Sequence, residues 1–227
     1  MTTPTELHFT FDGKPIDANV DQLVIAGWTG RDTAAVEEHI AELEAIGVAR
    51  PPATPCFYRA SASLLTQAPS IQALGANSSG EAECFMLASQ GDLWVGVGSD
   101  HTDRKVEAFD VTVSKQMCAK PVGPNLWRHA DVADHWDDLV LRSYATNDGI
   151  RRLYQEGSIA ALKPPTELIA SYRDGGALEP GTLMFGGTLA VIGKVGGADR
   201  FEVEIYDPAR DTSLLHAYDI QALPGAI

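Results

Sequence analysis

Apolar residues recur along this chain either at helical spacing or in short alternating runs. The clearest helical pattern covers Thr33 to Ile46, where Val36, Ile40 and Leu43 lie three or four residues apart. A glycine follows directly and marks the end of the pattern. We therefore predict a helix over this range, with its apolar stripe facing the core.

The other apolar segments are short and predict strands. Leu7–Phe11 alternates, and the Asp12-Gly13 pair after it is a hairpin turn signal. Further strands are predicted over Leu23–Trp28, Cys56–Arg59, Glu81–Ser89, Leu93–Gly98, Val106–Val113, Leu139–Ala145, Arg151–Gln155, Thr182–Ile192 and Phe201–Asp207. A short helical turn is predicted over Asp131–Trp136 and a short helix over Thr166–Arg173. One good helix among many short strands predicts an α+β fold that is mostly β, a mixed β-sandwich or barrel-like roll.

The length of 227 residues fits one main domain. We divide the chain into an N-terminal β appendage over residues 1–24 and a main domain over residues 25–227. Three cysteines at irregular spacing favour neither a disulfide framework nor a zinc site, and the N-terminus lacks a signal-peptide pattern. These features predict a cytoplasmic protein. Cys84 alternates with Glu83, so we expect it to point to the opposite face and pack in the core.

The formal net charge of −14 limits the partners of this protein. Nucleic acids and anionic membranes both present phosphates, which an acidic protein repels. The apolar stretches are too short to span a bilayer. We therefore expect no nucleic-acid partner and no membrane, and an anionic substrate would need local help from a metal, a lysine or an arginine.

Three acidic residues carry the main functional signal. Glu81 and Glu83 lie two positions apart in a predicted strand, so their side chains share one face, and Asp100 follows one hairpin later. Neighbouring carboxylates on a half-buried strand repel one another and lose solvation, and a divalent cation removes both costs. Oxygen ligands without Cys or His indicate Mg²⁺, Mn²⁺ or Ca²⁺ rather than zinc. The alternative is two surface glutamates and an unrelated turn aspartate.

Other residues give weaker signals, each with a structural alternative. His39 and Glu42 share a helical face and form a possible general-base pair, or are exposed residues of an acidic helix. Lys115, at the end of a predicted alternating strand, can bind an anionic substrate or stabilise an enolate, or is a surface lysine. Gly186-Gly187-Thr188 lets the main chain approach a ligand closely, or is an ordinary turn.

The order of these motifs, over about residues 25–195, resembles the fumarylacetoacetate hydrolase superfamily. The matching segments are Gly30-Arg31-Asp32 followed by His39 and Glu42, Pro55–Arg59, Glu81-Ala82-Glu83, Gly96–Arg104, Ser114-Lys115, Pro121–Pro124, Glu179–Gly181 and Gly187–Leu189. Thr182 replaces an aspartate of the family pattern, Leu189 replaces a proline, and the Asn-Tyr pair after Gly-Arg is missing. The chain therefore resembles a divergent branch, similar to the DUF2848 group.

This resemblance implies a catalytic domain over residues 25–227 in a mostly β roll that forms a homodimer. It implies a magnesium ion, or Mn²⁺ or Ca²⁺, held by Glu81, Glu83 and Asp100. The implied catalytic residues are His39, Glu42 and Lys115. The implied substrate-binding residues are Arg59, which is matched to a lysine of the family, Arg104, Gly187 and Thr188.

The implied reaction is metal-dependent hydrolysis of a carbon–carbon bond in a 2-oxo carboxylate, either an acylpyruvate or a derivative of a sugar acid. His39, oriented by Glu42, would activate water, and Lys115 with Arg59 would hold the substrate carboxylate or the enolate. Oxaloacetate-type decarboxylation, isomerisation and hydration are alternatives on the same site. Two hypotheses of other classes are a non-catalytic, metal-dependent binder of 2-oxo acids and a structural β domain without metal.

Overall fold

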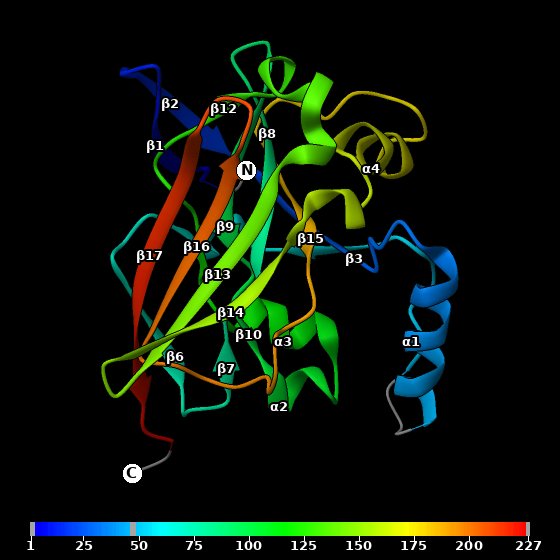
Figure 1. Ribbon diagram of the computed structural model, residues 1–227, viewed down its shortest axis with the longest axis vertical. Helices are drawn as coiled ribbons and strands as arrows, with labels where there is room; N and C mark the ends of the chain where they lie inside the picture. The colour runs from blue at the N-terminus through cyan, green and yellow to red at the C-terminus, as the bar shows by residue number, and fades with distance from the viewer. Residues whose placement is uncertain (1–2, 46–48, 226–227) are drawn as a thin grey trace.

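Two β-sheets form the main layers of the molecule (Figure 1). The computed structural model describes residues 3–45 and 49–225. The first sheet contains, in spatial order, β12 (Trp127–Arg128), β9 (Asp92–Ser99), β8 (Ala82–Ser89), β15 (Thr182–Thr188), β3 (Gln22–Gly27) and β4 (Cys56–Ala60). The second contains β14 (Ile150–Ser158), β13 (Val140–Asn147), β16 (Arg200–Asp207), β17 (Thr212–Leu223) and β6 (Ser70–Leu74). The predicted mostly β, mixed-sheet fold is confirmed.

Shorter elements complete the described chain. The two-stranded pairs are β1 (Thr5–Phe11) with β2 (Lys14–Val20), β7 (Ser78–Ser79) with β10 (Thr102–Asp103), and β5 (Leu65–Thr66) with β11 (Lys120–Pro121). The α-helices are α1 (Thr33–Ala45), α2 (Arg104–Glu107), α3 (Val111–Met117) and α4 (Pro165–Tyr172). The 3₁₀ turns are η1 (Ala62–Leu64), η2 (His129–Asp131), η3 (Ala133–Asp138) and η4 (Ile159–Ala161).

The six-stranded sheet buries apolar side chains on both faces. Alternate residues of β8 and β15 pack against the five-stranded sheet, so that Met86 and Met184 share a cluster with Val203 and Ile205. The other face carries a second cluster that includes Phe85, Phe185 and Ile25 together with side chains of the β1–β2 hairpin. Burial on both faces explains why β8 and β15 read as continuous apolar runs.

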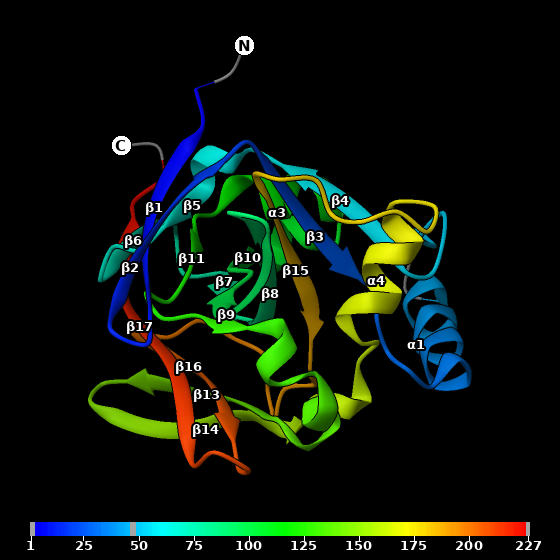
Figure 2. The same cartoon turned by 90° about the horizontal axis from the view of Figure 1, so that it is seen from above.

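The N-terminal hairpin lies against this second face (Figure 2). Leu7, Phe9 and Ile16 are buried there with Phe85. The next strand, β3, pairs in parallel with β15 inside the six-stranded sheet. A domain boundary between residues 24 and 25 stays a prediction, and it falls within β3.

One predicted strand is wrong. The segment Val106–Val113 covers the end of α2, the turn that follows it and the start of α3. Two aspartates decide this outcome, because the side chain of Asp103 accepts from the amides of residues 105 and 106, and that of Asp110 accepts from the amide of residue 113. Such N-caps favour helix initiation over the strand preference of the valines.

The predicted long helix is present as α1 and stands at the side of the molecule (Figures 1 and 2). Ile40 is buried, whereas most other side chains of the helix are exposed. The expected end at Ile46–Gly47 lies outside the described residues. None of the helices in the described part of the chain has both the length and the hydrophobicity that crossing a bilayer requires.

The contact between Phe85 and Gly96 gives a test of the core. These residues pair across β8 and β9, and a β-carbon at position 96 would lie 2.1 Å from the Phe85 ring. We expect Gly96→Ala to lower the free energy of unfolding by about 1–3 kcal/mol, the usual cost of an overpacked core. Introduced into a Phe85→Leu protein, the same change should cost less, because the shorter side chain leaves room.

Urea denaturation of the wild type, Gly96→Ala, Phe85→Leu and the double variant measures the cost of Gly96→Ala with and without the Phe85 ring. Gly196→Ala is the control, since its β-carbon would meet no described atom within 4 Å. Equal losses from Gly96→Ala and Gly196→Ala would contradict the prediction.

Candidate metal centre

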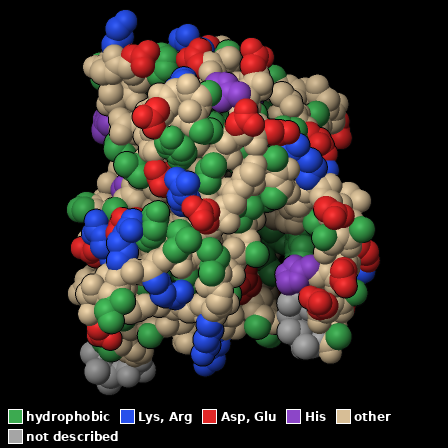
Figure 3. All heavy atoms as spheres, viewed as in Figure 1, with side chains coloured by type: hydrophobic (Ala, Val, Ile, Leu, Met, Phe, Trp, Pro, Cys, Tyr) green, Lys and Arg blue, Asp and Glu red, His purple; other side chains and the backbone are tan. Residues whose placement is uncertain are grey.

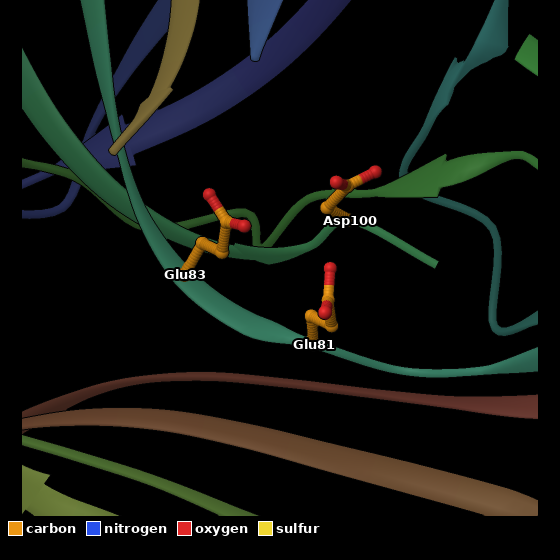
Figure 4. Close-up of side chains that lie close together, drawn as sticks. All are labelled: Glu81, Glu83 and Asp100. Carbon is orange, nitrogen blue, oxygen red and sulfur yellow. The ribbon is translucent and has the colours of Figure 1, made fainter. Parts of the chain in front are cut away.

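Pairing between β8 and β9 brings the three predicted acidic residues together. Glu83 pairs with Gly98, and the amide of Asp100 donates to the carbonyl oxygen of Glu81 over 3.0 Å. One carboxylate oxygen from each acid lies within 4.8 Å of the other two, and Figure 4 shows the three side chains projecting toward a shared space. Glu83 and Asp100 are buried and Glu81 is half-buried, so the alternative of two surface glutamates does not describe this structure.

Strand alternation explains the position of Glu83. It has the same parity along β8 as Phe85 and Leu87, whose side chains fill the cluster on the hairpin side of the sheet. Cys84 points the other way and packs between the two sheets, as predicted. Glu83 is therefore the polar end of an otherwise apolar row, and the residue is only 2% exposed.

Two lysine ammonium groups contact Asp100. Lys115 on α3 donates to Asp100 Oδ2, and its nitrogen lies 3.6 Å from Glu81 Oε2. The Lys120 nitrogen lies 3.0 Å from Asp100 Oδ1 and donates to the carbonyl oxygen of His101 over 2.6 Å. Both lysines are buried, which is rare without a charged partner. Lys115 was predicted at a strand end, and the structure corrects this to a helix.

Arg104 and Glu107 extend the charged cluster. Arg104 Nη1 donates to Glu81 Oε1 and to Glu107 Oε2, each over 2.9 Å, and its Nε donates to Ser79 Oγ over 2.6 Å. Arg104 was predicted to bind substrate, but three of its bonds go to protein groups. It holds the Glu81 carboxylate in place.

Burial and charge set the protonation of the cluster. Burial raises the pKa of the Glu83 carboxyl well above its ordinary value, and the charges of Asp100 and Glu81 raise it further. Burial also opposes ionisation of Asp100, but Lys115 and Lys120 outweigh it and lower the pKa of Asp100 to about 2. Burial would lower the pKa of Lys115, yet Asp100 and Glu81 outweigh it and the pKa is raised. Asp100 is ionised at neutral pH, whereas burial and the neighbouring negative charges favour the protonated form of Glu83.

Gly187 positions the Glu83 carboxylate. Its amide donates to Glu83 Oε2 over 2.7 Å. The residue has φ +94, and a β-carbon there would lie 1.9 Å from Thr29 Oγ1. Both features require glycine. The main chain approaches Glu83 and Thr29 closely at this position, and the predicted approach to a ligand stays a prediction.

Thr188 is bonded within the protein. Its hydroxyl donates to the carbonyl oxygen of Ala82 over 2.7 Å and accepts from Gln155 Nε2 over 2.8 Å. Gln155 Oε1 in turn accepts from the amide of Ala82 over 3.0 Å. Gln155, on β14, therefore fixes the strand that leads from Glu81 to Glu83. The sequence did not single it out, because its partners are distant in the chain.

His39 lies on α1, which stands apart from the helices α2 and α3 of the charged cluster (Figures 1 and 2). Its Nδ1 is 3.5 Å from Glu42 Oε2, and both side chains are exposed. The His39 ring lies 5.9 Å from the ring of Trp28. Trp28 Nε1 donates to the hydroxyl of Tyr58 over 3.2 Å, and the Tyr58 ring lies 6.0 Å from Lys115 Nζ. Two aromatic residues thus connect the histidine to the cluster.

Tyr58, rather than Arg59, faces the charged cluster. Successive residues of β4 point to opposite faces, and Tyr58 packs with the hairpin-side cluster to which Phe85 belongs. Arg59 is exposed and donates to the hydroxyl of Tyr172 on α4 over 3.2 Å. The structure therefore brings Glu81, Glu83, Asp100, Lys115, Arg104 and Gly187 together, and it places Arg59 on the other side of the sheet.

Sequence reasoning missed Lys120 and Glu107. Lys120 directly precedes the Pro121–Pro124 motif, and nothing local distinguishes it from a surface lysine. Glu107 lies three residues after Arg104, a spacing that brings the two side chains together on a helix. That pair was hidden because the segment was predicted as a strand.

The residues present fit a hard divalent cation. Three carboxylates converge, and Asp100 Oδ1 is buried without a hydrogen bond from any described group, since the nearby Lys120 lies outside hydrogen-bonding geometry. Oxygen donors alone are the set that Mg²⁺, Mn²⁺ and Ca²⁺ prefer. A cation would also compensate the charge of Glu83, whose ionisation the protein disfavours.

Comparison with solved structures identifies the fold class. The yeast protein ynq8, a fumarylacetoacetate hydrolase family protein, superposes with a TM-score of 0.63 and 16% identity over 91% of this chain and 95% of its own. Cg1458 superposes with a TM-score of 0.63 and 16% identity, over 94% of this chain and 84% of its own. A 2-keto-3-deoxy-D-arabinonate dehydratase, complexed with magnesium and 2,5-dioxopentanoate, superposes with a TM-score of 0.61 and 17% identity. The match covers 95% of this chain and 79% of the dehydratase. The fold is that of the fumarylacetoacetate hydrolase family.

The family model described as "Protein of unknown function (DUF2848)" matches residues 26–218. The chain belongs to the DUF2848 family. No curated protein matches it. The predicted similarity to the DUF2848 group is thereby confirmed, and the solved structures confirm the predicted fold.

The raised pKa of Glu83 predicts an effect on stability. The folded, metal-free protein binds the Glu83 proton more tightly than the unfolded chain does. This contribution to stability is complete below the unfolded pKa of about 4.3 and is lost as the pH rises through the folded value. We therefore expect metal-free Glu83→Gln to melt at a higher temperature than the wild type at neutral pH.

Thermal melting with and without Mg²⁺ or Mn²⁺ provides the measurement. A saturating cation should raise the melting temperature of the wild type and not that of Glu83→Gln. Glu38→Gln, at an exposed site on α1, is the control and should respond as the wild type does. A lower melting temperature for metal-free Glu83→Gln would contradict the prediction.

Proposed function

We propose that this protein is a divalent-metal-dependent enzyme that hydrolyses a carbon–carbon bond in a 2-oxo carboxylate. The observation that carries the proposal is the buried convergence of Glu81, Glu83 and Asp100 beside the ammonium group of Lys115. A dehydratase of the same fold supports the proposal, because its structure is complexed with magnesium and the 2-oxo acid 2,5-dioxopentanoate.

Glu81, Glu83 and Asp100 would hold Mg²⁺ or Mn²⁺, with Ca²⁺ as a further candidate. When bound, the cation would polarise the 2-oxo group as a Lewis acid. Gly187 and Arg104 keep two of the three carboxylates oriented through their bonds to Glu83 and Glu81. Such fixed orientation is what a metal site needs from its surroundings.

Lys115 would bind the negative charge of the substrate. Its ammonium group is buried, remains charged beside Asp100, and faces the ring of Tyr58. A fixed positive charge in a water-poor site stabilises an enolate or a carboxylate strongly. Gly187 and Thr188 would border the substrate next to Glu83. Arg59 lies on the opposite face of β4, so the proposal gives it no substrate contact.

His39 would accept the proton of the attacking water. Its Nδ1 faces Glu42, which leaves Nε2 as the basic atom. Figure 3 shows a hollow between α1 and the rest of the molecule. Movement of α1 toward the body would close this hollow, bring His39 to the substrate and exclude solvent. Trp28 and Tyr58 form the aromatic surface between the two parts of the site.

A second reaction needs fewer groups. His39 lies apart from the acidic residues in this conformation, and decarboxylation of a 3-oxo acid would require only the cation and Lys115. This observation keeps an oxaloacetate-type decarboxylase as the second candidate. Homodimer formation, a cytoplasmic setting and a catalytic domain over residues 25–227 stay predictions.

An assay with acylpyruvates, oxaloacetate and 2-oxo-3-deoxy sugar acids, with Mg²⁺ or Mn²⁺ and with EDTA, tests the function. We expect turnover of one class that EDTA abolishes. For hydrolysis, His39→Ala should lower kcat by about 10²–10⁴-fold, the usual contribution of a general base, and leave cation affinity unchanged.

His8→Ala is a matched control, because His8 is also exposed and paired with a carboxylate, that of Asp17, at 2.7 Å. It should keep full activity. Decarboxylation that survives His39→Ala would favour the second candidate. Cation binding without turnover of any class would favour a non-catalytic binder, and the lack of a cation effect would overturn the proposed site.

A further inference from the structure

A tyrosine from the five-stranded sheet reaches the acidic cluster through one serine. Tyr218 on β17 is completely buried, and its hydroxyl donates to Ser99 Oγ over 2.8 Å. Ser99 Oγ also accepts from the amide of Glu81 over 3.1 Å. The amide of Glu81 thus shares its acceptor with a hydroxyl from the opposite layer of the molecule.

The hydrogen bonds of this network run in one direction. His101 Nδ1 lies 3.0 Å from the Tyr218 hydroxyl, and His101 Nε2 lies 2.9 Å from Ser78 Oγ. Because Tyr218 gives its proton to Ser99, His101 donates from Nδ1 and accepts from Ser78 at Nε2. Each group in the sequence Ser78, His101, Tyr218 and Ser99 therefore donates to the next. A directed network of this kind fixes side-chain orientation.

The ring of Tyr218 also contacts residues that flank the acids. A β-carbon at Gly80 would lie 2.7 Å from the Tyr218 hydroxyl, so the chain rests directly on this tyrosine one residue before Glu81. The His101 ring, one residue after Asp100, lies 5.7 Å from the Tyr218 ring at an interplanar angle of 80°. Tyr218 therefore touches the backbone or a side chain next to two of the three acids.

We propose that Tyr218 is a positioning residue for the cation site, acting through Ser99 on Glu81 and through His101 on the Asp100 segment. The inference rests on the proposed cation site. Carboxylates from two separate segments hold a divalent cation tightly only if both segments are held at the right separation. Tyr218 links these segments from one side, and the four bonds around it set their spacing.

The test measures Mn²⁺ and Mg²⁺ affinity by titration calorimetry on the full chain, together with the melting temperature of each metal-free protein. We expect Tyr218→Phe to weaken cation binding about tenfold, the lower end of the range for groups that support metal ligands. Tyr154→Phe is the matched control. Tyr154 is also completely buried in the same aromatic cluster, but its hydroxyl accepts from the amide of Gly196 over 3.3 Å.

A residue that only stabilises the core would lower the melting temperature without changing cation affinity. Tyr154→Phe should behave in this way, and Tyr218→Phe should not. Ser99→Ala should reproduce the part of the affinity loss that passes through Glu81. The double variant should lose less affinity than the sum of the two single losses, because both changes interrupt the same connection to Glu81, while the contact of Tyr218 with His101 is lost only with Tyr218→Phe. Ser99→Ala also keeps the test decisive if Tyr218→Phe fails to fold.

Equal cation affinity in Tyr218→Phe and wild type, or an equal loss in Tyr154→Phe, would overturn the assignment. Full additivity of Tyr218→Phe and Ser99→Ala would overturn the route through Ser99. A wild-type protein that binds neither ion would instead refute the proposed cation site, and the role of Tyr218 would fall with it.

Discussion

The Asp100 carboxylate, held between the ammonium groups of Lys115 and Lys120, is the contact on which the site depends. Lys115 belongs to α3 and Lys120 to β11, so one buried carboxylate connects a helix and a short strand to the end of the six-stranded sheet. Breaking a buried ion pair leaves an uncompensated charge, at a cost of about 3–5 kcal/mol. The position of Lys115 beside Glu81 follows from this contact.

Much of the site was predictable from local sequence rules. Alternation along β8 places Glu83 with Phe85 on one face and Cys84 on the other, as the structure confirms. The turn between β8 and β9 is short, so Asp100 had to return next to Glu81. Alternation also shows why Arg59 misses the cluster, since its neighbour Tyr58 occupies the inward position on β4.

The remainder depends on contacts that no local pattern encodes. Valines between residues 106 and 113 favour a strand, and the capping bonds of Asp103 and Asp110 decide for helices instead. Lys120 has no distinguishing sequence context. Gln155 and Tyr218 come from the five-stranded sheet, more than 70 residues from their partners near Glu81. Only the packing of the two layers reveals that they support the acidic residues.

The balance of charge within the buried cluster has a consequence for the order of binding events. Glu81, Glu83, Asp100 and Glu107 carry four negative charges when ionised, and Lys115, Lys120 and Arg104 carry three positive ones, which leaves a net charge of −1. Protonation of Glu83 brings the sum to zero, so in neither state does the metal-free cluster attract a carboxylate ligand. A bound divalent ion reverses the net charge to +1, so an anionic ligand is attracted only afterwards. On the proposed function, the charge of the cluster would therefore favour an order of binding in which the cation enters first and the organic acid second.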